Sequence, residues 1–299
     1  MNERLSLPNY GGQAVIEGVL MRGARSLAIA MRAPDKQIVI HTEALGSIYT
    51  SGIAKIPFLR GLILLWDSLG LGIRALTISA NMQTGEDEKL EGPALYLTLG
   101  ISLAIGIGGF VLVPAAIGQL AEKLFHWNNF TGNLLEGCIR LGLLVGYIAL
   151  VGRMEDIRRV FAYHGAEHKT INAFEAGVDL IPENVARYSV EHPRCGTAFL
   201  LTLALLSILL FAALGPLPMV WRFATRILLL PVLAGLAYEY IRWTAHHLDN
   251  PIVRLLIKPN LALQHLTTRE PTMDMLEVSI AGFKAMRTQE EQLIENRAE

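Results

Sequence analysis

Charged residues are scarce in this sequence, and neither sign is in excess. Only 18% of the 299 residues are charged, and 26 basic residues stand against 27 acidic ones, which gives a formal net charge of −1. Proteins that bind nucleic acid through its phosphates usually present a strongly basic surface. The charge balance therefore argues against nucleic acid as a partner.

Cysteines are also few, and a secretion signal is not evident. The two cysteines are Cys138, inside an apolar run, and Cys195, in a polar stretch beside His192. Such different surroundings do not favour a disulfide between them. The first 50 residues lack the basic start, apolar core and small-residue cleavage site of a signal peptide, so we expect the amino terminus to stay in the cytoplasm.

Apolar residues, in contrast, are abundant. Hydrophobic residues make up 52% of the chain and the mean hydropathy is +0.38, which is more apolar than an ordinary soluble domain. A helix needs about 20 largely apolar residues to cross a bilayer. Four runs meet this need, at 94–118, 134–151, 197–215 and 223–244. The sequence therefore predicts a mainly α-helical, polytopic membrane protein with about four transmembrane helices.

A fifth apolar run, residues 53–79, is predicted to lie in the membrane interface. It carries Arg60, Asp67 and Arg74 at seven-residue intervals. This spacing places the three charges on one face of a helix, as in an amphipathic helix that rests on the bilayer surface. Within 134–151, Glu136 and Arg140 are four residues apart and can pair on one helical face.

Positive charge predicts which side of the membrane each loop faces. The loop 152–196 holds six Lys and Arg residues, whereas 119–133 holds Lys123 alone. Because cytoplasmic loops are enriched in Lys and Arg, we predict that 152–196 and both termini lie in the cytoplasm of a multi-pass protein of the cell membrane. This topology places Arg222 and Arg226 at the outer end of the fourth span.

The remaining segments predict a small β unit and a helical carboxyl-terminal region. Residues 26–45 form two alternating runs around Pro34, which is typical of a hairpin, and 11–23 is a strand-like run flanked by glycines. Residues 250–271 suggest an amphipathic segment broken by Pro259, and 272–297 a docked terminal helix.

These features divide the chain into six regions. They are a cytoplasmic β-rich region (1–52), the interfacial helix with an acidic linker (53–92), a first transmembrane hairpin (93–151), a cytoplasmic loop (152–196), a second transmembrane hairpin (197–244) and a cytoplasmic helical region (245–299).

The cytoplasmic loop contains the densest set of potential metal ligands. His164, Glu167 and His168 fit the pattern H-x-x-E-H. Two histidines four residues apart project from one face of a helix, so both imidazoles can reach one divalent ion, most plausibly zinc. The glutamate between them can act as a ligand or as a base towards a metal-bound water. We therefore predict a metal site with Glu167 as its catalytic residue.

A zinc enzyme needs a third protein ligand, and the sequence offers three candidates. His192 and Cys195 are three residues apart just before the third span, and Glu239 lies within the fourth span. A carboxylate inside a span usually marks a site or an ion pair. Arg242, three residues on, gives Glu239 an ion-pair partner that suits a purely structural role equally well.

Less specific interpretations compete with metal binding. Histidines near a membrane surface are often only amphipathic interface residues, and helical charges such as Glu167 and Lys169 usually form a solvated face. Cys195 can be a packed, inert thiol, and Glu17 an ordinary exposed strand residue. The pattern alone does not decide between these alternatives.

Four stretches together resemble the YqhQ-like family of bacterial integral membrane proteins, whose function is unknown. They are GGQAVIEGVLMRG (11–23), YHGAEHKTINAFE (163–175), HPRCGTAFL (192–200) and LQHLTTREP (263–271). The resemblance implies a membrane location and, because such proteins are described as predicted metal-dependent enzymes, a metal site. It implies no particular reaction. The matching residues with useful chemistry are Glu17, His164, Glu167, His168, His192, Arg194, Cys195, Gln264, Thr267, Thr268, Arg269 and Glu270.

Two hypotheses of function follow. The first is a metal-dependent, hydrolase-like membrane enzyme with its site at the cytoplasmic face and the lipid bilayer as its surroundings. The alternative is a non-enzymatic, homo-oligomeric transport or channel protein, or a membrane scaffold. Glycine-rich spans such as GISLAIGIGG (100–109) permit close helix approach and favour the alternative.

Overall fold

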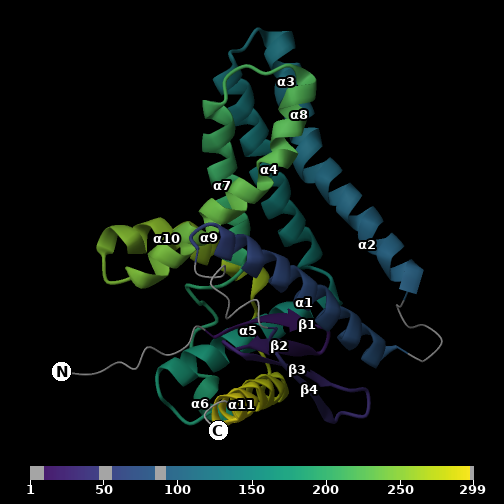
Figure 1. Cartoon of the computed structure of the whole chain (residues 1–299), viewed down its shortest axis with the longest axis vertical. Coiled ribbons are helices and arrows are strands. Elements are labelled where there is room, and N and C mark those ends of the chain that lie inside the picture. Colours follow the sequence, from purple (N-terminus) through teal and green to yellow (C-terminus); the bar gives the residue numbers. More distant parts are fainter. Residues whose placement is uncertain (1–9, 47–55, 85–91, 297–299) are drawn as a thin grey trace.

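The computed structural model describes residues 10–46, 56–84 and 92–296. It is mainly helical, with a β unit at one end and a tall helical bundle at the other (Figure 1). The predicted mainly α-helical fold with a small amino-terminal β unit is confirmed. The acidic linker lies outside the described residues, apart from Gly92.

The β unit is a four-stranded antiparallel sheet in the order β1-β2-β3-β4. The strands are β1 (Gly11–Val15), β2 (Gly18–Arg22), β3 (Ser26–Arg32) and β4 (Ile38–Ala44). The predicted hairpin at 26–45 is confirmed by the pairing of β3 with β4. The run 11–23 is not one strand but a second hairpin, because Ile16 and Glu17 form a two-residue turn in which Glu17 has a φ of 53°.

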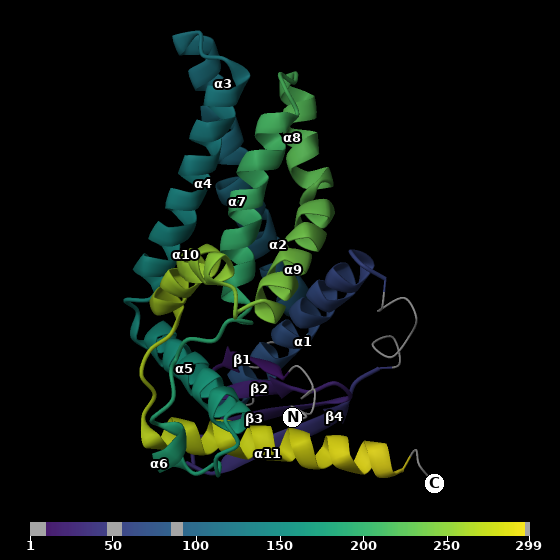
Figure 2. The same ribbon diagram turned by 90° about the vertical axis from the view of Figure 1, so that its left-hand side faces the viewer.

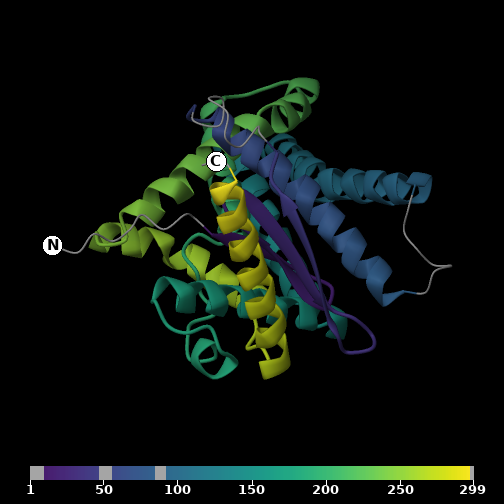
Figure 3. The same cartoon turned by 60° about the horizontal axis from the view of Figure 1, so that its bottom comes forward.

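Helices cover both faces of the sheet. Ala28 and Ala30 of β3 pack with α5 (Glu155–Glu175) and α11 (Met273–Glu295), whereas Leu27 and Ile29 pack with α1 (Leu59–Gln83). Successive side chains of a strand point to opposite faces, so nearly all of β3 is buried. Figure 2 shows α11 below the sheet and α1 above it, and Figure 3 shows α11 crossing the strands. The predicted terminal helix is thus confirmed.

Several helices are apolar enough to be compatible with a membrane protein. By length and composition, α1, α4 (Asn129–Val151) and the 34-residue run Gly92–Phe125 could each cross a bilayer. That run comprises α2 (Gly92–Ile107), the π-helix η4 (Gly108–Leu112) and α3 (Val113–Phe125). The pair α8 (Met219–Leu228) and α9 (Leu230–His246), bent by 43°, would make a fourth span, whereas the apolar helix α7 (Thr197–Ala213) has only 17 residues.

The helix α1 lies between the sheet and the bundle (Figures 1 and 2). Leu71 and Ala75 in its second half pack on the sheet, while Gly61 near its start lies against Tyr238 of α9. It is long and apolar enough to cross a bilayer. It also packs on apolar residues of the β unit. The interfacial position of this helix stays a prediction.

The helix α10 (Pro251–Thr267) shows that the predicted break at Pro259 is wrong. The helix continues through this proline, which lies on its exposed side. Proline removes one hydrogen bond from a helix, but the buried side chains of Val253 and Leu263, before and after Pro259, pack against the rest of the protein and hold the helix in place. A short helix, α6 (Pro182–Val185), completes the described elements.

A buried cluster of charged side chains, Glu136, Arg140, Arg222 and Arg226, connects the helices of the bundle. The predicted pair of Glu136 and Arg140 is confirmed, with Oε1 and Nη2 2.7 Å apart. Arg222 and Arg226 of α8 also turn inward, and Nη2 of Arg226 lies 2.8 Å from Oε2 of Glu136. Nε of Arg140 donates to the carbonyl of Phe110 in η4. Each guanidinium thus binds groups on neighbouring helices, as charged side chains within apolar bundles generally must.

Candidate metal centre

The H-x-x-E-H motif lies in the middle of α5, where the helix is most buried. His164 and His168 are one turn apart on one side of α5, and their ring centroids are 4.3 Å apart. The helix packs between the sheet, α11 and the chain that follows it. The predicted common face of the two histidines is therefore present in the structure.

Backbone carbonyls fix the orientation of both imidazoles. Nδ1 of His164 lies 2.9 Å from the carbonyl oxygen of Thr267, and Nδ1 of His168 lies 2.5 Å from that of Val190. Because a carbonyl can only accept, each Nδ1 carries the proton and donates it. This leaves the lone pair on Nε2 in both rings, which is how metal-binding histidines are usually held.

Cys195 brings a sulfur to the two free nitrogens. Its Sγ lies 3.2 Å from Nε2 of His164, and the ligand atoms of His164, His168 and Cys195 all lie within 4.8 Å of one another. Around a tetrahedral zinc, nitrogen and sulfur ligands are roughly 3.5 Å apart. The backbone N–H of Thr197, 3.4 Å from Sγ, points a donor at it, as suits a thiolate. These three residues could therefore hold a zinc ion once small shifts bring their donor atoms to that spacing.

The carboxylate of Glu167 faces the same space. Its Oε2 lies 3.5 Å from Nε2 of His168 and 3.9 Å from Nε2 of His164. The side chain is buried, and a Cβ on Gly12 of β1 would lie only 2.9 Å from its Cγ, so the strand can approach only with glycine there. Burial raises the pKa of Glu167 to about 7. A carboxyl group with such a pKa suits a general base near neutral pH.

His192 lies beside the donors but has an unused nitrogen. Its ring centroid is 5.5 Å from that of His168, and its buried Nε2 has no hydrogen-bond partner in the described structure. Burial, together with the nearby charge of Arg194, lowers the pKa of His192 to about 3, so the ring is neutral. Gln264 holds the backbone of His192 through two hydrogen bonds, of 3.0 and 2.8 Å. An orphaned nitrogen here suits a fourth ligand or a hydrogen bond to a bound group.

Glu239 is placed elsewhere. Its carboxylate accepts two hydrogen bonds from Arg60 of α1, one of them 2.7 Å long, and a third from the backbone N–H of Phe58. It does not belong to the three-ligand group found among the described residues. Its ion-pair partner is Arg60 rather than the predicted Arg242.

The interpretation of Glu167 and Lys169 as a solvated helix face is wrong. Both side chains are buried because the β unit and the chain after α5 cover this part of the helix. Nζ of Lys169 donates to the carbonyls of Ala186 and Tyr188, at 2.8 and 2.7 Å. The lysine thereby holds the segment that leads to the carbonyl of Val190 and on to His192.

Glu17 is also more than an exposed strand residue. From the turn between β1 and β2 its carboxylate accepts two hydrogen bonds of 2.5 Å from Arg159 of α5. Arg159 lies five residues before His164 in the same helix. The pair therefore joins the β unit to the helix that carries the motif.

Sequence reasoning missed the groups that orient the ligands. The carbonyls of Thr267 and Val190 are backbone atoms, which have no signature of their own in a sequence. Gln264 and Thr197 fall in the stretches LQHLTTREP and HPRCGTAFL, and only the structure shows that they hold His192 and Cys195.

Comparisons with known proteins place the chain in a family whose function is unknown. A family described as "Protein of unknown function (DUF1385)" matches residues 56–289. The chain is also 34% identical over 299 residues to "Uncharacterized protein YqhQ" of Bacillus subtilis (strain 168), with 93% of this chain and 92% of that protein covered. The chain therefore belongs to the DUF1385, or YqhQ-like, family, and the predicted resemblance is confirmed. No solved structure matches it.

Acidification should stabilise the metal-free protein relative to its Glu167→Gln variant. The pKa of Glu167 is about 7 in the folded chain against an ordinary 4.5, so the folded state binds a proton first as the pH falls. The contribution of Glu167 to the free energy of unfolding should therefore rise by up to about 3 kcal/mol as the pH falls from roughly 8 to 5. Apparent melting temperatures measured with a chelator at both pH values check this. His192 is common to both proteins, so parallel pH profiles would contradict the raised pKa.

Proposed function

We propose that the protein is a zinc-dependent, hydrolase-like enzyme with its site at the cytoplasmic face of the membrane. The observation that carries the proposal is the convergence of Nε2 of His164, Nε2 of His168 and Sγ of Cys195, with both Nδ1 atoms anchored on carbonyls. Three protein ligands leave a tetrahedral ion one open position, which is typical of catalytic rather than structural zinc.

The surrounding side chains suit hydrolysis. A bound zinc would polarise a substrate oxygen and acidify a water molecule. Glu167 would accept the proton of that water at Oε2, which faces the two histidines, and would return it to the leaving group. The neutral ring of His192 offers its unpaired Nε2 to the substrate or as a further ligand.

The position of α5 supports a site near a membrane surface. Figure 2 shows α5 at the junction of the apolar bundle and the β unit. The turn before α5, the helix itself and the loop after it carry the one lysine and five arginines that predict a cytoplasmic location. The homo-oligomeric transport or scaffold role stays a prediction.

Metal analysis of the purified full-length protein tests the proposal. Wild type should retain about one zinc per chain, and the double variant His164→Ala, His168→Ala should retain almost none, because a single thiolate cannot hold the ion. The matched control is His246→Ala with His247→Ala, two exposed histidines at the end of α9 that should leave zinc unchanged.

Cobalt substitution adds an independent readout. A cobalt-loaded wild type should show a sulfur-to-cobalt charge-transfer band that Cys195→Ser removes. Equal, negligible metal in wild type and in the double histidine variant would reject the proposed function.

A further inference from the structure

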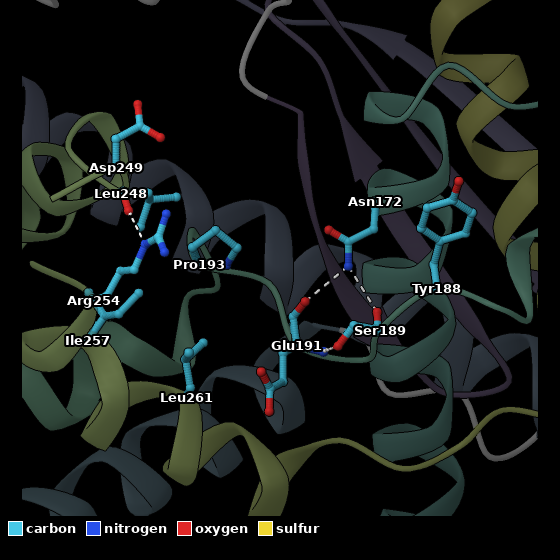
Figure 4. Close-up of a pocket in the computed structure, with 10 residues that line it drawn as sticks. All are labelled: Asn172, Tyr188, Ser189, Glu191, Pro193, Leu248, Asp249, Arg254, Ile257 and Leu261. Carbon is cyan, nitrogen blue, oxygen red and sulfur yellow. Dashed lines mark hydrogen bonds between the residues drawn. The ribbon is translucent and has the colours of Figure 1, made fainter. Parts of the chain in front are cut away.

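A pocket of about 520 Å³ lies between the chain before His192 and the helix α10 (Figure 4). This volume is within the range of small-molecule sites. In Figure 4, Arg254 and Ile257 line one side, Asn172 and Tyr188 the other, and Pro193 and Glu191 lie between them. The pocket thus lies between the segment around His192 and the amphipathic helix α10.

The pocket shares a wall with the metal centre. Glu191 and Pro193 are the neighbours of His192 in sequence. Asn172 follows His168 by one turn of α5, and its amide donates to the carbonyls of Ser189 and Glu191 at 2.9 and 3.0 Å. A molecule in the pocket would therefore lie beside the segment that carries His192 and leads to Cys195.

Arg254 is the one cation among the residues that line the pocket, which also include the carboxylates of Glu191 and Asp249. Nε of Arg254 donates to the carbonyl of Leu248 at 2.7 Å, which fixes the guanidinium. Its two terminal nitrogens make no hydrogen bond to the described residues and can meet a ligand. The carboxylate of Glu191 faces His265 at 2.7 Å, and that of Asp249 points away from the other lining residues in Figure 4. A fixed guanidinium is well suited to a phosphate group.

The side of the pocket formed by α10 also carries apolar residues and adjoins an apolar surface. Ile257 and Leu261 of α10 line it, while Ile252, Leu255 and Leu256 on the same helix are 46 to 66% exposed. Figures 1 and 2 show α10 at the foot of the bundle, between the bundle and α5. A helix with this pattern suits the membrane interface, where lipid headgroups are the neighbouring molecules.

We propose that this pocket binds an anionic membrane phospholipid, with its phosphate on Arg254 and the first carbons of its acyl chains along Ile257 and Leu261. That such a lipid is the substrate rests on the zinc-dependent hydrolysis proposed above, whereas its binding needs no metal. The pocket holds a headgroup and the start of the chains, and the rest of the lipid stays along α10.

Binding of dihexanoylphosphatidylglycerol to the full-length protein in detergent tests this assignment. Wild type should bind this short-chain lipid saturably, and Arg254→Gln should weaken binding by about tenfold or more, because a charge-assisted contact is lost. The matched control is Lys258→Gln, which removes the same charge one turn further along α10, on an exposed residue outside the pocket lining. It should bind as wild type does.

Two further ligands test whether binding needs the acyl chains and the negative charge of the lipid. Glycerol 3-phosphate, which lacks acyl chains, and dihexanoylphosphatidylcholine, which is zwitterionic, should both bind more weakly than the anionic lipid. Equal binding by Arg254→Gln and wild type, or glycerol 3-phosphate binding as tightly as the lipid, would overturn the assignment. The variant His164→Ala, His168→Ala should bind the lipid normally without zinc, so failure of the metal proposal and failure of this one are distinguishable.

Discussion

Replacing Glu136 with glutamine is expected to destabilise the helical bundle by about 3–5 kcal/mol, because it leaves buried guanidiniums without their counter-ion. The carboxylate is 1% exposed and accepts hydrogen bonds from Arg140, Arg222 and Arg226. Glutamine keeps one acceptor oxygen but no charge. The apparent melting temperature in detergent should fall by on the order of 10 °C.

The same substitution at Glu122 provides the matched control. Glu122 is partly exposed, and among the described residues its ion pair is with Arg222 alone, with Nη1 and Oε2 2.8 Å apart. Arg222 would still contact Asn133 and Glu136 after the change. Glu122→Gln should therefore lower the melting temperature much less. Equal effects of the two substitutions would show that Glu136 does not hold the cluster together.

This cluster shows what a sequence can and cannot predict. Glu136 and Arg140 are four residues apart in one helix, so their pairing follows from helical geometry. Arg226 reaches the same carboxylate across 90 residues, and no local pattern indicates that contact. Glu239 is similar, because its partner Arg60 is 179 residues away. Arg242, the neighbour in sequence, was the wrong partner for that reason.

The candidate metal centre could also be predicted only in part. The helical spacing of His164 and His168 predicted a shared face, and Cys195 was among the candidate third ligands. The carbonyls that orient the two rings belong to residues 22 and 103 positions away from them. Long-range backbone contacts depend on the tertiary fold, so they appear only in the structure.

The β unit gives a local example. The hairpin at 26–45 could be predicted because Pro34 and Asp35 mark its turn. The hairpin within 11–23 was missed because its turn is Ile16-Glu17, without the usual Asn-Gly or Asp-Gly pair. Glu17 adopts a left-handed backbone conformation there and binds Arg159. The local sequence does not favour this turn, and the ion pair that accompanies it joins residues far apart in the chain, so the turn could not be predicted from the local sequence.

Gly165→Ala is expected to weaken zinc binding by about 10- to 100-fold, which is the usual cost of disturbing the groups that orient metal ligands. A Cβ at this position would collide with the backbone carbonyl oxygen of Arg269 and lie 3.3 Å from Cγ1 of Val190. The backbone of Arg269 is fixed, because its N–H donates to the carbonyl of Phe161. Relief of the collision must therefore move the segment that holds His164.

The collision affects both anchors at once. The carbonyl of Thr267, two residues before Arg269, accepts from His164, and the carbonyl of Val190 accepts from His168. Zinc affinity measured by competition with a chelator checks the effect. Gly196→Ala is the matched control, since a Cβ there meets nothing within 4 Å although Gly196 follows Cys195 directly. Unchanged affinity in Gly165→Ala, together with normal folding, would mean that these two carbonyls do not set the geometry of the ligands.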